Sequence, residues 1–266
     1  MISLKSVEVT FGRGSLDEHR VLRGVDLEVG RGERLSIIGS NGSGKTTLLN
    51  AIAGTVPLSG GKVLIEGVDR SLDPEWLRAR YVGRVRQDPL AGTAGDMSVI
   101  DNLALAARKG PRRLLPALTP RVKRELAARV AELGMGLENR LGENVGRLSG
   151  GQRQALTLLM AAISRPAVLL LDEHTAALDP HNAQIVTELT RRFVSEYALT
   201  VLSVTHDMRR ALEESDRLIM MHEGRIVVDV SGAEKAGLGV GDLVELFGRA
   251  RKEACAEDEL LLGAGA

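Results

Sequence analysis

A glycine-rich stretch near the start of the chain has the residues of a phosphate-binding loop. Residues 39–46 read GSNGSGKT and fit the pattern G-x-x-x-x-G-K-[ST]. Small residues allow the backbone to wrap a triphosphate and to aim its N–H groups inward. The Lys45 ammonium would add a positive charge at the outer phosphates, and the Thr46 hydroxyl can bind Mg²⁺. On its own, this pattern predicts that the chain binds a nucleoside triphosphate.

The elements around this loop favour the same interpretation. Arg34 to Ile38 (RLSII) predicts a buried strand, and Lys45 to Ala53 (KTTLLNAIA) predicts the helix that follows. The N-terminus of such a helix directs about half a positive charge toward bound phosphates. The alternative is a glycine-rich turn that contains Lys-Thr by chance. The residues expected to hold the nucleotide are Gly39, Ser40, Asn41, Gly42, Ser43, Gly44, Lys45, Thr46 and Thr47.

A second motif, LSGGQ at residues 148–152, stands before a predicted helix from Gln152 to Ser164. A serine and two glycines at the start of a helix offer an anion a hydroxyl, bare N–H groups and a favourable dipole. An ordinary helix cap is the alternative. Together, the loop and this motif resemble the ATP-binding cassette (ABC) ATPases, whose signature sequence is LSGGQ.

The resemblance implies a shared ATP site. In ABC ATPases two cassettes dimerise head to tail, and the signature of one closes over ATP held by the other. This chain carries one copy of each motif, so we expect a homodimer with two such sites. The residues that would face the partner's nucleotide are Ser149, Gly150, Gly151 and Gln152.

Two acidic residues follow a short apolar run. Ala167 to Leu171 (AVLLL) has the pattern of a strand buried on both faces, and Asp172 and Glu173 come directly after it. Open α/β sheets place their ligands at the carboxyl ends of their strands. Asp172 suits Mg²⁺, and Glu173 suits a general base that polarises the attacking water. A solvated strand end or a helix cap is the alternative for both acids.

Two further residues gain catalytic roles from the resemblance. His206 follows the predicted strand from Leu199 to Thr205, where the family has a histidine that contacts the γ-phosphate and orients Glu173. Gln87 matches the family's glutamine loop, whose side chain reaches Mg²⁺ and the water. The alternatives are a structural histidine after a strand, and a glutamine before the turn-forming Asp-Pro pair.

The resemblance also assigns Asp179 and Phe11. Asp179 matches the loop that crosses the dimer interface, and it equally has the place of an N-cap before Pro180. Phe11 corresponds to the aromatic residue that stacks on adenine, with a core phenylalanine as the alternative. His174 departs from the family pattern, in which proline commonly follows the glutamate. This departure puts only the local backbone geometry, and a pH sensitivity, in question.

The composition limits the other classes of function. Lys and Arg total 35, as do Asp and Glu, so a net charge of zero does not favour nucleic acid as a partner. The single cysteine, Cys255, excludes an internal disulfide and fits a reducing cytoplasm. The N-terminus resembles a strand rather than a secretion signal, and no apolar run reaches the roughly 20 residues of a membrane helix. Any work on a membrane is therefore expected to pass through another protein.

The order of the predicted elements gives the expected fold class: an α/β P-loop NTPase core of ABC type with an antiparallel N-terminal β subdomain and an inserted α-helical subdomain. Predicted strands occupy the N-terminal part, and Ala/Leu-rich helical patterns follow Gln87. We expect the ABC ATPase domain at residues 1–230, with the helical subdomain at about 88–165. Residues 231–266 would form a short helical extension, with Asp242 and Glu245 as a capping box and a loose tail from Glu257.

The resemblance, over about residues 2–230, implies an ATP-hydrolysing subunit of a bacterial ABC transporter. It would bind ATP and Mg²⁺, drive a separate membrane permease, and lie at the cytoplasmic face of the membrane. The absence of a fused membrane segment favours an importer. Residues 172–180, with 149–160, resemble a bacterial subgroup that is paired with extracytoplasmic substrate-binding proteins, and this resemblance suggests amino acids as the cargo. The basic segment 108–113 is either solvated surface or a contact with anionic lipid. The alternative function is a soluble ABC ATPase of iron–sulfur assembly.

Overall fold

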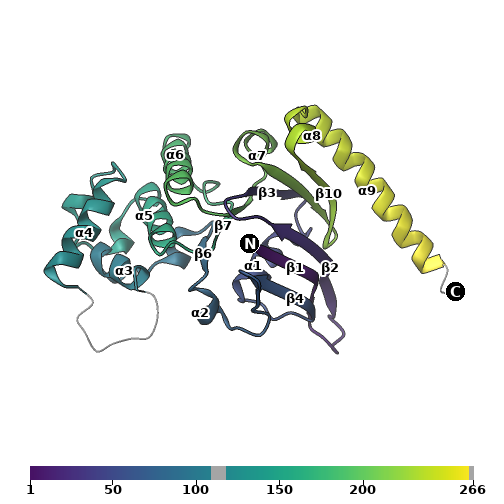
Figure 1. Cartoon of the computed structure of the whole chain (residues 1–266), viewed down its shortest axis with the longest axis horizontal. Helices are drawn as coiled ribbons and strands as arrows, with labels where there is room; N and C mark the ends of the chain where they lie inside the picture. Colours follow the sequence, from purple (N-terminus) through teal and green to yellow (C-terminus); the bar gives the residue numbers. More distant parts are fainter. Residues whose placement is uncertain (109–117, 264–266) are drawn as a thin grey trace. The chain divides into compact units, whose positions relative to one another are not determined.

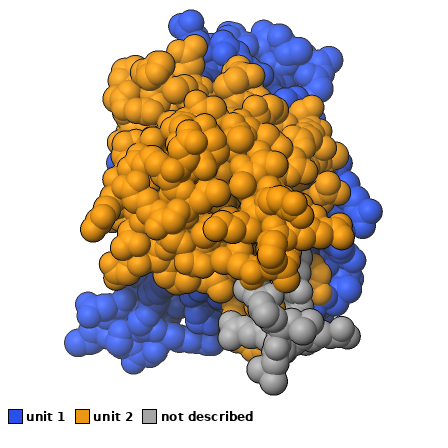
Figure 2. Space-filling model, turned by 90° about the vertical axis from the view of Figure 1, so that its left-hand side faces the viewer, with its two compact units in different colours: residues 1–75, 201–266 blue, residues 76–200 orange. Residues whose placement is uncertain are grey.

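The computed structural model describes residues 1–108 and 118–263, and the chain forms two compact units. Unit 1 comprises Met1–Glu75 and Val201–Ala266, and unit 2 comprises Trp76–Thr200. Figure 2 shows unit 1 in blue and unit 2 in orange. Unit 1 therefore joins the two ends of the chain, and it contains the glycine-rich loop. Unit 2 is continuous in sequence and contains the signature motif and the two acids.

Unit 1 contains an antiparallel sheet with the strand order β2-β1-β4-β5. Its strands are β1 (Ile2–Phe11), β2 (His19–Val29), β4 (Gly60–Ile65) and β5 (Val68–Asp69). Leu4 of β1 pairs with Leu27 of β2 and with Val63 of β4, and all three side chains are buried. Apolar residues at alternating positions thus give this sheet one buried face.

A second set of strands in unit 1 carries the phosphate loop. The central strand β3 (Arg34–Gly39) pairs in parallel with β8 (Val201–Val204) and β9 (Arg217–His222), and β9 pairs antiparallel with β10 (Arg225–Ser231). Leu35, Ile37 and Ile38 of β3 are almost completely buried, as the predicted apolar strand requires. Because β3 and β8 are parallel, the segments after both strands emerge at the same edge.

The helices of unit 1 among the described residues are α1 (Lys45–Ala53), α7 (Met208–Glu214), α8 (Gly232–Ala236) and α9 (Val240–Gly263). The observed α1 has the predicted bounds. Asp207 caps α7, since its Oδ1 accepts a hydrogen bond of 3.0 Å from the N–H of Arg210. The long helix α9, yellow in Figure 1, packs against β10 and α7.

The described part of unit 2 has two parallel strands, β6 (Val82–Val85) and β7 (Val168–Asp172), and every residue of β7 is buried. Its longer helices are α3 (Val99–Ala106), α4 (Pro120–Ala131), α5 (Gly150–Ile163) and α6 (Pro180–Tyr197). Its short elements are α2 (Glu75–Arg78, whose first residue belongs to unit 1) and the 3-10 turns η1 (Pro89–Gly92), η2 (Leu137–Asn139) and η3 (Val145–Arg147).

Two expectations about the C-terminal tail are wrong. Helix α9 continues to Gly263, so the backbone from Glu257 is helical rather than loose. Asp242 is not an N-cap residue, because its Oδ2 accepts a hydrogen bond of 2.7 Å from the N–H of Gly239, which precedes the helix. The carboxylate thus stabilises the helix start from within the first turn. From residue 109 onward, the predicted basic segment lies outside the described residues.

Candidate functional site

The glycine-rich loop owes its shape to the backbone. β3 ends at Gly39 and α1 begins at Lys45, with Gly44 as the N-cap residue at φ +99°. Gly39 has φ +150°, and a Cβ atom there would lie 2.3 Å from the carbonyl oxygen of Met221 on the adjacent strand β9. The N–H of Gly224 donates to the carbonyl of Ser43 at 3.0 Å. The loop is therefore supported by the end of β9 and the turn that follows it.

The polar groups of this loop fit a phosphate ligand. Lys45 is buried, and its Nζ donates to the carbonyls of Gly39 and Ser40 at 2.8 Å each. The hydroxyl of Ser43 is buried and has no hydrogen-bond partner among the described residues. Thr46 is exposed in the first turn of α1. The loop thus offers an anion a cation, a hydroxyl without a partner, and the positive end of a helix.

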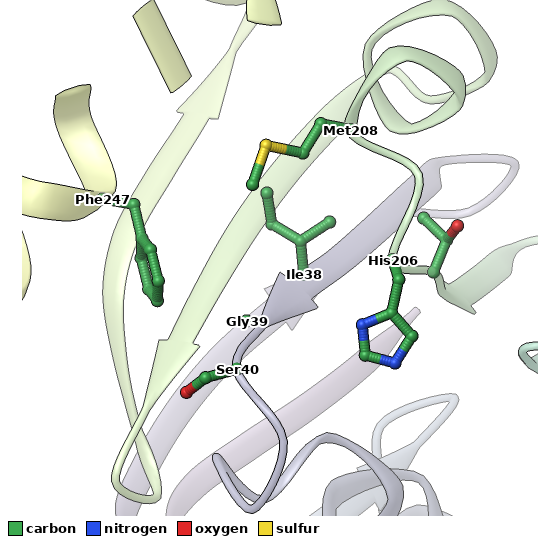
Figure 3. Close-up of a pocket in the computed structure, with 7 residues that line it drawn as sticks. Ile38, Gly39, Ser40, His206, Met208 and Phe247 are labelled. Atoms are coloured by element: carbon green, nitrogen blue, oxygen red, sulfur yellow. The ribbon is translucent and has the colours of Figure 1, made fainter. Parts of the chain in front are cut away.

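His206 lies beside this loop, in the segment after β8. The N–H of Thr205 donates to the carbonyl of Ile37 at 3.3 Å, which holds the segment to β3. A cavity of about 160 Å³ is lined by Gly39, Ser40 and His206, together with Ile38, Thr205, Met208 and Phe247 (Figure 3). The structure therefore brings the predicted histidine next to two of the predicted loop residues. Phe11 does not line this cavity, and it lies at the end of β1 with 45 % of its surface exposed.

In unit 2, the two acids lie at the end of β7 as predicted. Asp172 is 8 % exposed, and its Oδ2 lies 3.4 Å from Nη2 of Arg84 on the parallel strand β6. Glu173 has a left-handed backbone with φ +46°. Such a conformation in a non-glycine residue costs of order 1–3 kcal/mol and is typical of functional sites. The surrounding contacts must therefore hold Glu173 in place.

A buried glutamine supplies such a contact, and the sequence analysis missed it. Gln154 of α5 is 0 % exposed. Its Nε2 donates to the carbonyl of His174 at 2.5 Å and to the carbonyl of Arg86 at 3.2 Å. These carbonyls belong to the neighbours of Glu173 and Gln87. One side chain therefore connects the signature helix to both predicted catalytic segments. The signal in the sequence was an amide side chain directly before a largely apolar helical run.

His174, the departure from the family pattern, is itself fixed in place. Its side chain is buried, and its Nε2 lies 3.2 Å from Oγ1 of Thr190 on α6. The carbonyl of the same residue accepts the hydrogen bond from Gln154. The imidazole thus attaches the segment after Glu173 to α6, whereas the side chain of a proline could form no such hydrogen bond.

The signature motif forms a capping box at the start of α5. Oγ of Ser149 accepts from the N–H of Gln152, and Oε1 of Gln152 accepts from the N–H of Ser149, both at 3.2 Å. Gln152 also bonds Arg140 and the carbonyl of Met135. A Cβ atom on Gly151 would lie 2.2 Å from the side chain of Asn182 on α6. Gln152 and Gly151 therefore have structural roles, whereas Ser149 and Gly150 are exposed.

The two remaining predicted residues lie at exposed element boundaries of unit 2. Asp179 caps α6, accepting hydrogen bonds from the N–H of Asn182 at 3.1 Å and from its side-chain amide at 2.6 Å. These hydrogen bonds lower the pKa of the Asp179 carboxyl. Gln87 follows β6 and is exposed, and Asp88 next to it caps the turn η1. Neither residue is buried by its own unit.

The structure bears on two expectations, that the chain has no membrane-spanning helix and that it binds Mg²⁺ together with a nucleotide. Within residues 1–108 and 118–263, no helix combines the length and the apolar character that crossing a membrane requires. Among the side chains that the structure describes, in residues 1–108 and 118–252, no group of three or more His, Cys, Asp and Glu could hold a metal ion. A Mg²⁺ ion bound with a nucleotide needs only one or two carboxylates beside the phosphates, so the single carboxylate of Asp172 is compatible with it.

Comparison with known proteins gives consistent matches. The ABC transporter family profile matches residues 22–176. The tyrosine transport ATP-binding protein of Clostridioides difficile is 40 % identical over 247 residues, which cover 93 % of this chain and 98 % of that protein. A sulfate/thiosulfate import ATP-binding protein of Methylococcus capsulatus is 36 % identical over 83 % of this chain and 62 % of its own length.

A solved structure supports the predicted fold class. The dimeric ATP-binding cassette MJ0796, in a post-hydrolysis state bound to ADP and Pi, aligns with a TM-score of 0.73 and 26 % identity. The alignment covers 87 % of this chain and 98 % of that chain. The expected α/β fold of ABC type is thus confirmed. The chain belongs to the ABC transporter family, and it is a nucleotide-binding ATPase that couples ATP hydrolysis to transport.

Proposed function

We propose that this chain is the ATPase subunit of an importer, in which two copies enclose two ATP molecules and drive a separate membrane permease. One observation carries the proposal: a single chain combines a phosphate loop with a capped signature helix whose Ser149 and Gly150 are exposed. The N–H groups and the hydroxyl of such a site have their anion only when another molecule presents a phosphate to it. The relatives named for tyrosine transport and for sulfate import support the assignment.

Unit 1 would bind the nucleotide. Lys45 would exchange its two carbonyl partners for phosphate oxygens, and Ser43 would donate its hydroxyl. Backbone N–H groups and the N-terminus of α1 would surround the same phosphates, with Thr47 in its first turn. Phe11, which is 45 % exposed, has the surface to stack on adenine. These contacts would stabilise bound ATP equally in the ground state and in the transition state of hydrolysis.

Unit 2 would supply the catalytic acids. When bound, Mg²⁺ neutralises charge on the outer phosphates; Thr46, Asp172 and Gln87 are the residues that would hold it. Glu173 would accept a proton from the attacking water, a role worth about 10²–10⁴ in rate. His206 would donate a hydrogen bond to the transferred phosphate and orient the water. Arg84 would hold the Asp172 carboxylate in position through their contact at 3.4 Å.

The second copy would complete each site. Its Ser149 hydroxyl and the N–H of its Gly150 would contact the outer phosphate, and Asp179 would cross the interface. The dimer of MJ0796 with ADP and Pi supports this arrangement. The permease would contact the exposed Leu90 and Met97 in the segment after Gln87. Amino acids are the proposed cargo, delivered by an extracytoplasmic binding protein, and the subunit would lie at the cytoplasmic face of the membrane.

Replacing the proposed base tests the catalytic assignment. We expect Glu173→Gln to bind ATP normally and to lower turnover at least about 100-fold, since the amide cannot accept the proton. ATP-dependent dimerisation, measured by size-exclusion chromatography with light scattering, should become stable because hydrolysis no longer separates the copies. Turnover within twofold of wild type would remove Glu173 from its role.

Blocking the signature tests the shared site separately. We expect Ser149→Arg to leave ATP binding by the single subunit unchanged and to abolish hydrolysis, because the large side chain fills the exposed anion site. The matched control is Ser195→Arg near the end of α6. Mixing the Ser149→Arg and Lys45→Ala chains should restore one of the two sites, and about a quarter to a half of the activity, if sites are shared. Full activity of Ser149→Arg as a monomer would contradict the dimer.

A further inference from the structure

The cavity beside the phosphate loop has a wall that comes from the C-terminal helix. Phe247 of α9 lines it together with Gly39, Ser40 and His206. Figure 3 shows the Phe247 ring pointing from α9 toward the segment of Gly39 and Ser40. A side chain from the far end of the chain, well beyond residues 22–176 of the family match, therefore borders the proposed nucleotide site.

Helix α9 is fixed to the strand that leads into the loop. Leu243, one turn before Phe247, is 0 % exposed and packs in one apolar cluster with Ile38, Met220 and Val230. Ile38 directly precedes Gly39. Since i and i+4 lie on the same helix face, burying Leu243 directs Phe247 to the same side. Val244, which follows Leu243, lies on a different side of the helix and is 53 % exposed.

A second contact links Phe247 to the end of β9, the strand whose Met221 carbonyl lies against Gly39. Its ring lies edge-on to the ring of His222, with centroids 6.2 Å apart and an interplanar angle of 90°. His222 follows Met221, whose carbonyl leaves room only for a glycine at position 39. Neither ring nitrogen of His222 has a hydrogen-bond partner among the described residues. Nε2 lies 3.9 Å from Oε1 of Glu223, beyond hydrogen-bond distance, and the His222 side chain is 12 % exposed. Packing therefore contributes to the orientation of this largely buried ring, and Phe247 supplies an aromatic contact to it.

We propose that Phe247 is a positioning residue for ATP binding: α9 uses it to hold the start of the phosphate loop between Ile38 and His222. The inference rests on the proposed function, in which this loop binds ATP. Gly39 and Ser40 supply the carbonyls that hold Lys45, so a shift of this segment would displace the ammonium as well. The loop contacts ATP in the ground state and in the transition state. Loss of its position therefore raises KM and leaves kcat nearly unchanged.

The test compares two alanine variants on one helix in the full-length protein. We expect Phe247→Ala to raise the Kd and KM for ATP about five- to tenfold with kcat within about twofold, which is the signature of lost uniform binding. Val244→Ala is the matched control, because it removes an exposed side chain from the same helix. Phe247→Tyr should restore the affinity, since it keeps the ring. Kd is measured by titration calorimetry with ATP, and KM and kcat by phosphate release.

Each possible result either supports or overturns the proposed role of Phe247. Phe247→Ala with a Kd within about 1.5-fold of wild type overturns the inference, as does an equal loss in Val244→Ala. A lowered melting temperature with unchanged Kd would show that Phe247 is only structural. If Phe247→Ala does not fold, Phe247→Leu, which keeps apolar volume but lacks the ring, replaces it under the same criteria. If wild type itself binds no ATP, the proposed function fails instead.

Discussion

The two units hold their proposed functional groups in place by different means. In unit 1 the phosphate loop depends on backbone geometry, with glycines at positive φ and the carbonyl of Met221 on β9 close by. In unit 2 the acids depend on side chains, because Gln154, His174 and Arg84 hold the segment at the end of β7. The phosphate loop should therefore be sensitive to added atoms, and the acidic segment to lost hydrogen bonds.

The same contrast holds for backbone strain. Gly39, Gly42 and Gly44 adopt positive φ at little cost because they lack a Cβ atom. Glu173 adopts φ +46° with a full side chain, so its neighbours must compensate for the strain. A glycine could not replace it, since the proposed chemistry requires the carboxylate. Unit 2 thus needs its hydrogen-bond network because its special backbone position carries a functional side chain.

The largest effect in this comparison is expected from one added methyl group in unit 1. In Gly39→Ala, the new Cβ would lie 2.3 Å from the Met221 carbonyl, which is a backbone atom that cannot rotate away. Strain of about 3 kcal/mol in the loop would weaken ATP binding about 100-fold. Calorimetric titration with ATP measures the change.

Gly32→Ala is the matched control for this variant. Gly32 also has positive φ, at +74°, but a Cβ atom there meets nothing within 4 Å. We expect a loss of about 1–2 kcal/mol in unfolding free energy, from the left-handed backbone alone, and unchanged ATP affinity. Equal losses of affinity in both variants would show that positive φ, rather than the Met221 carbonyl, determines the sensitivity of the loop.

A smaller effect is expected when unit 2 loses hydrogen bonds without losing volume. Gln154→Met has a similar shape but cannot donate to the carbonyls of His174 and Arg86. We expect kcat to fall about tenfold as Glu173 and Gln87 lose their fixed positions, with ATP affinity within twofold. This pattern is the reverse of that predicted for the phosphate loop. Single-turnover phosphate release, normalised to the ATP-binding fraction, measures it.

The same exchange at an exposed glutamine provides the control. Gln184→Met on α6 should leave both kcat and ATP affinity unchanged, because Gln184 is solvent-exposed. If Gln154→Met lowers the melting temperature but keeps the wild-type kcat in its folded fraction, Gln154 has no positioning role. Equal losses of kcat and affinity would remove the contrast between the units.

Local motifs explain which parts could be predicted from the sequence. The loop, the signature and the acid pair are contiguous runs, and their flanking strands and helices follow from apolar pattern and caps. α1 has the predicted bounds, and Asp179 caps α6 as its place before Pro180 indicates. The fold class is also confirmed by structural similarity. Each of these predictions needed only neighbouring residues.

Residues that act across long sequence separations could not be predicted in this way. Gln154 reaches Arg86 over 68 positions, and Arg84 reaches Asp172 over 88. Phe247 meets the phosphate loop only after the chain has returned to unit 1. Such contacts depend on packing that no local pattern encodes. The C-terminal helix is a similar case: Leu243 packs against Ile38 and Met220, far away in sequence, and α9 continues through the segment from Glu257 that its sequence alone suggested to be a loose end.

The smallest expected effect concerns an ion pair in unit 1 and its dependence on pH. Asp216 bonds Arg34 at the start of β3, with Oδ1 2.6 Å from Nη2, and this hydrogen bond lowers the pKa of the Asp216 carboxyl. A carboxyl with a lowered folded-state pKa contributes stability above its unfolded pKa of about 3.9 and loses it as pH falls through the folded value. Both side chains are 46 % exposed, so screening limits the effect to about 0.5 kcal/mol.

Asp216→Asn isolates this contribution. The unfolding free energy of wild type should exceed that of the variant by about 0.5 kcal/mol at pH 7, and the difference should shrink as pH falls below about 4. Urea unfolding at pH 7, 4 and 3 measures it. ATP affinity should stay unchanged, because this pair lies at the end of β3 opposite Gly39. A difference that is independent of pH would mean that the substitution removes packing or hydrogen bonding rather than charge. A changed ATP affinity would mean that the two ends of β3 are coupled, so that the phosphate loop does not depend on its local backbone alone.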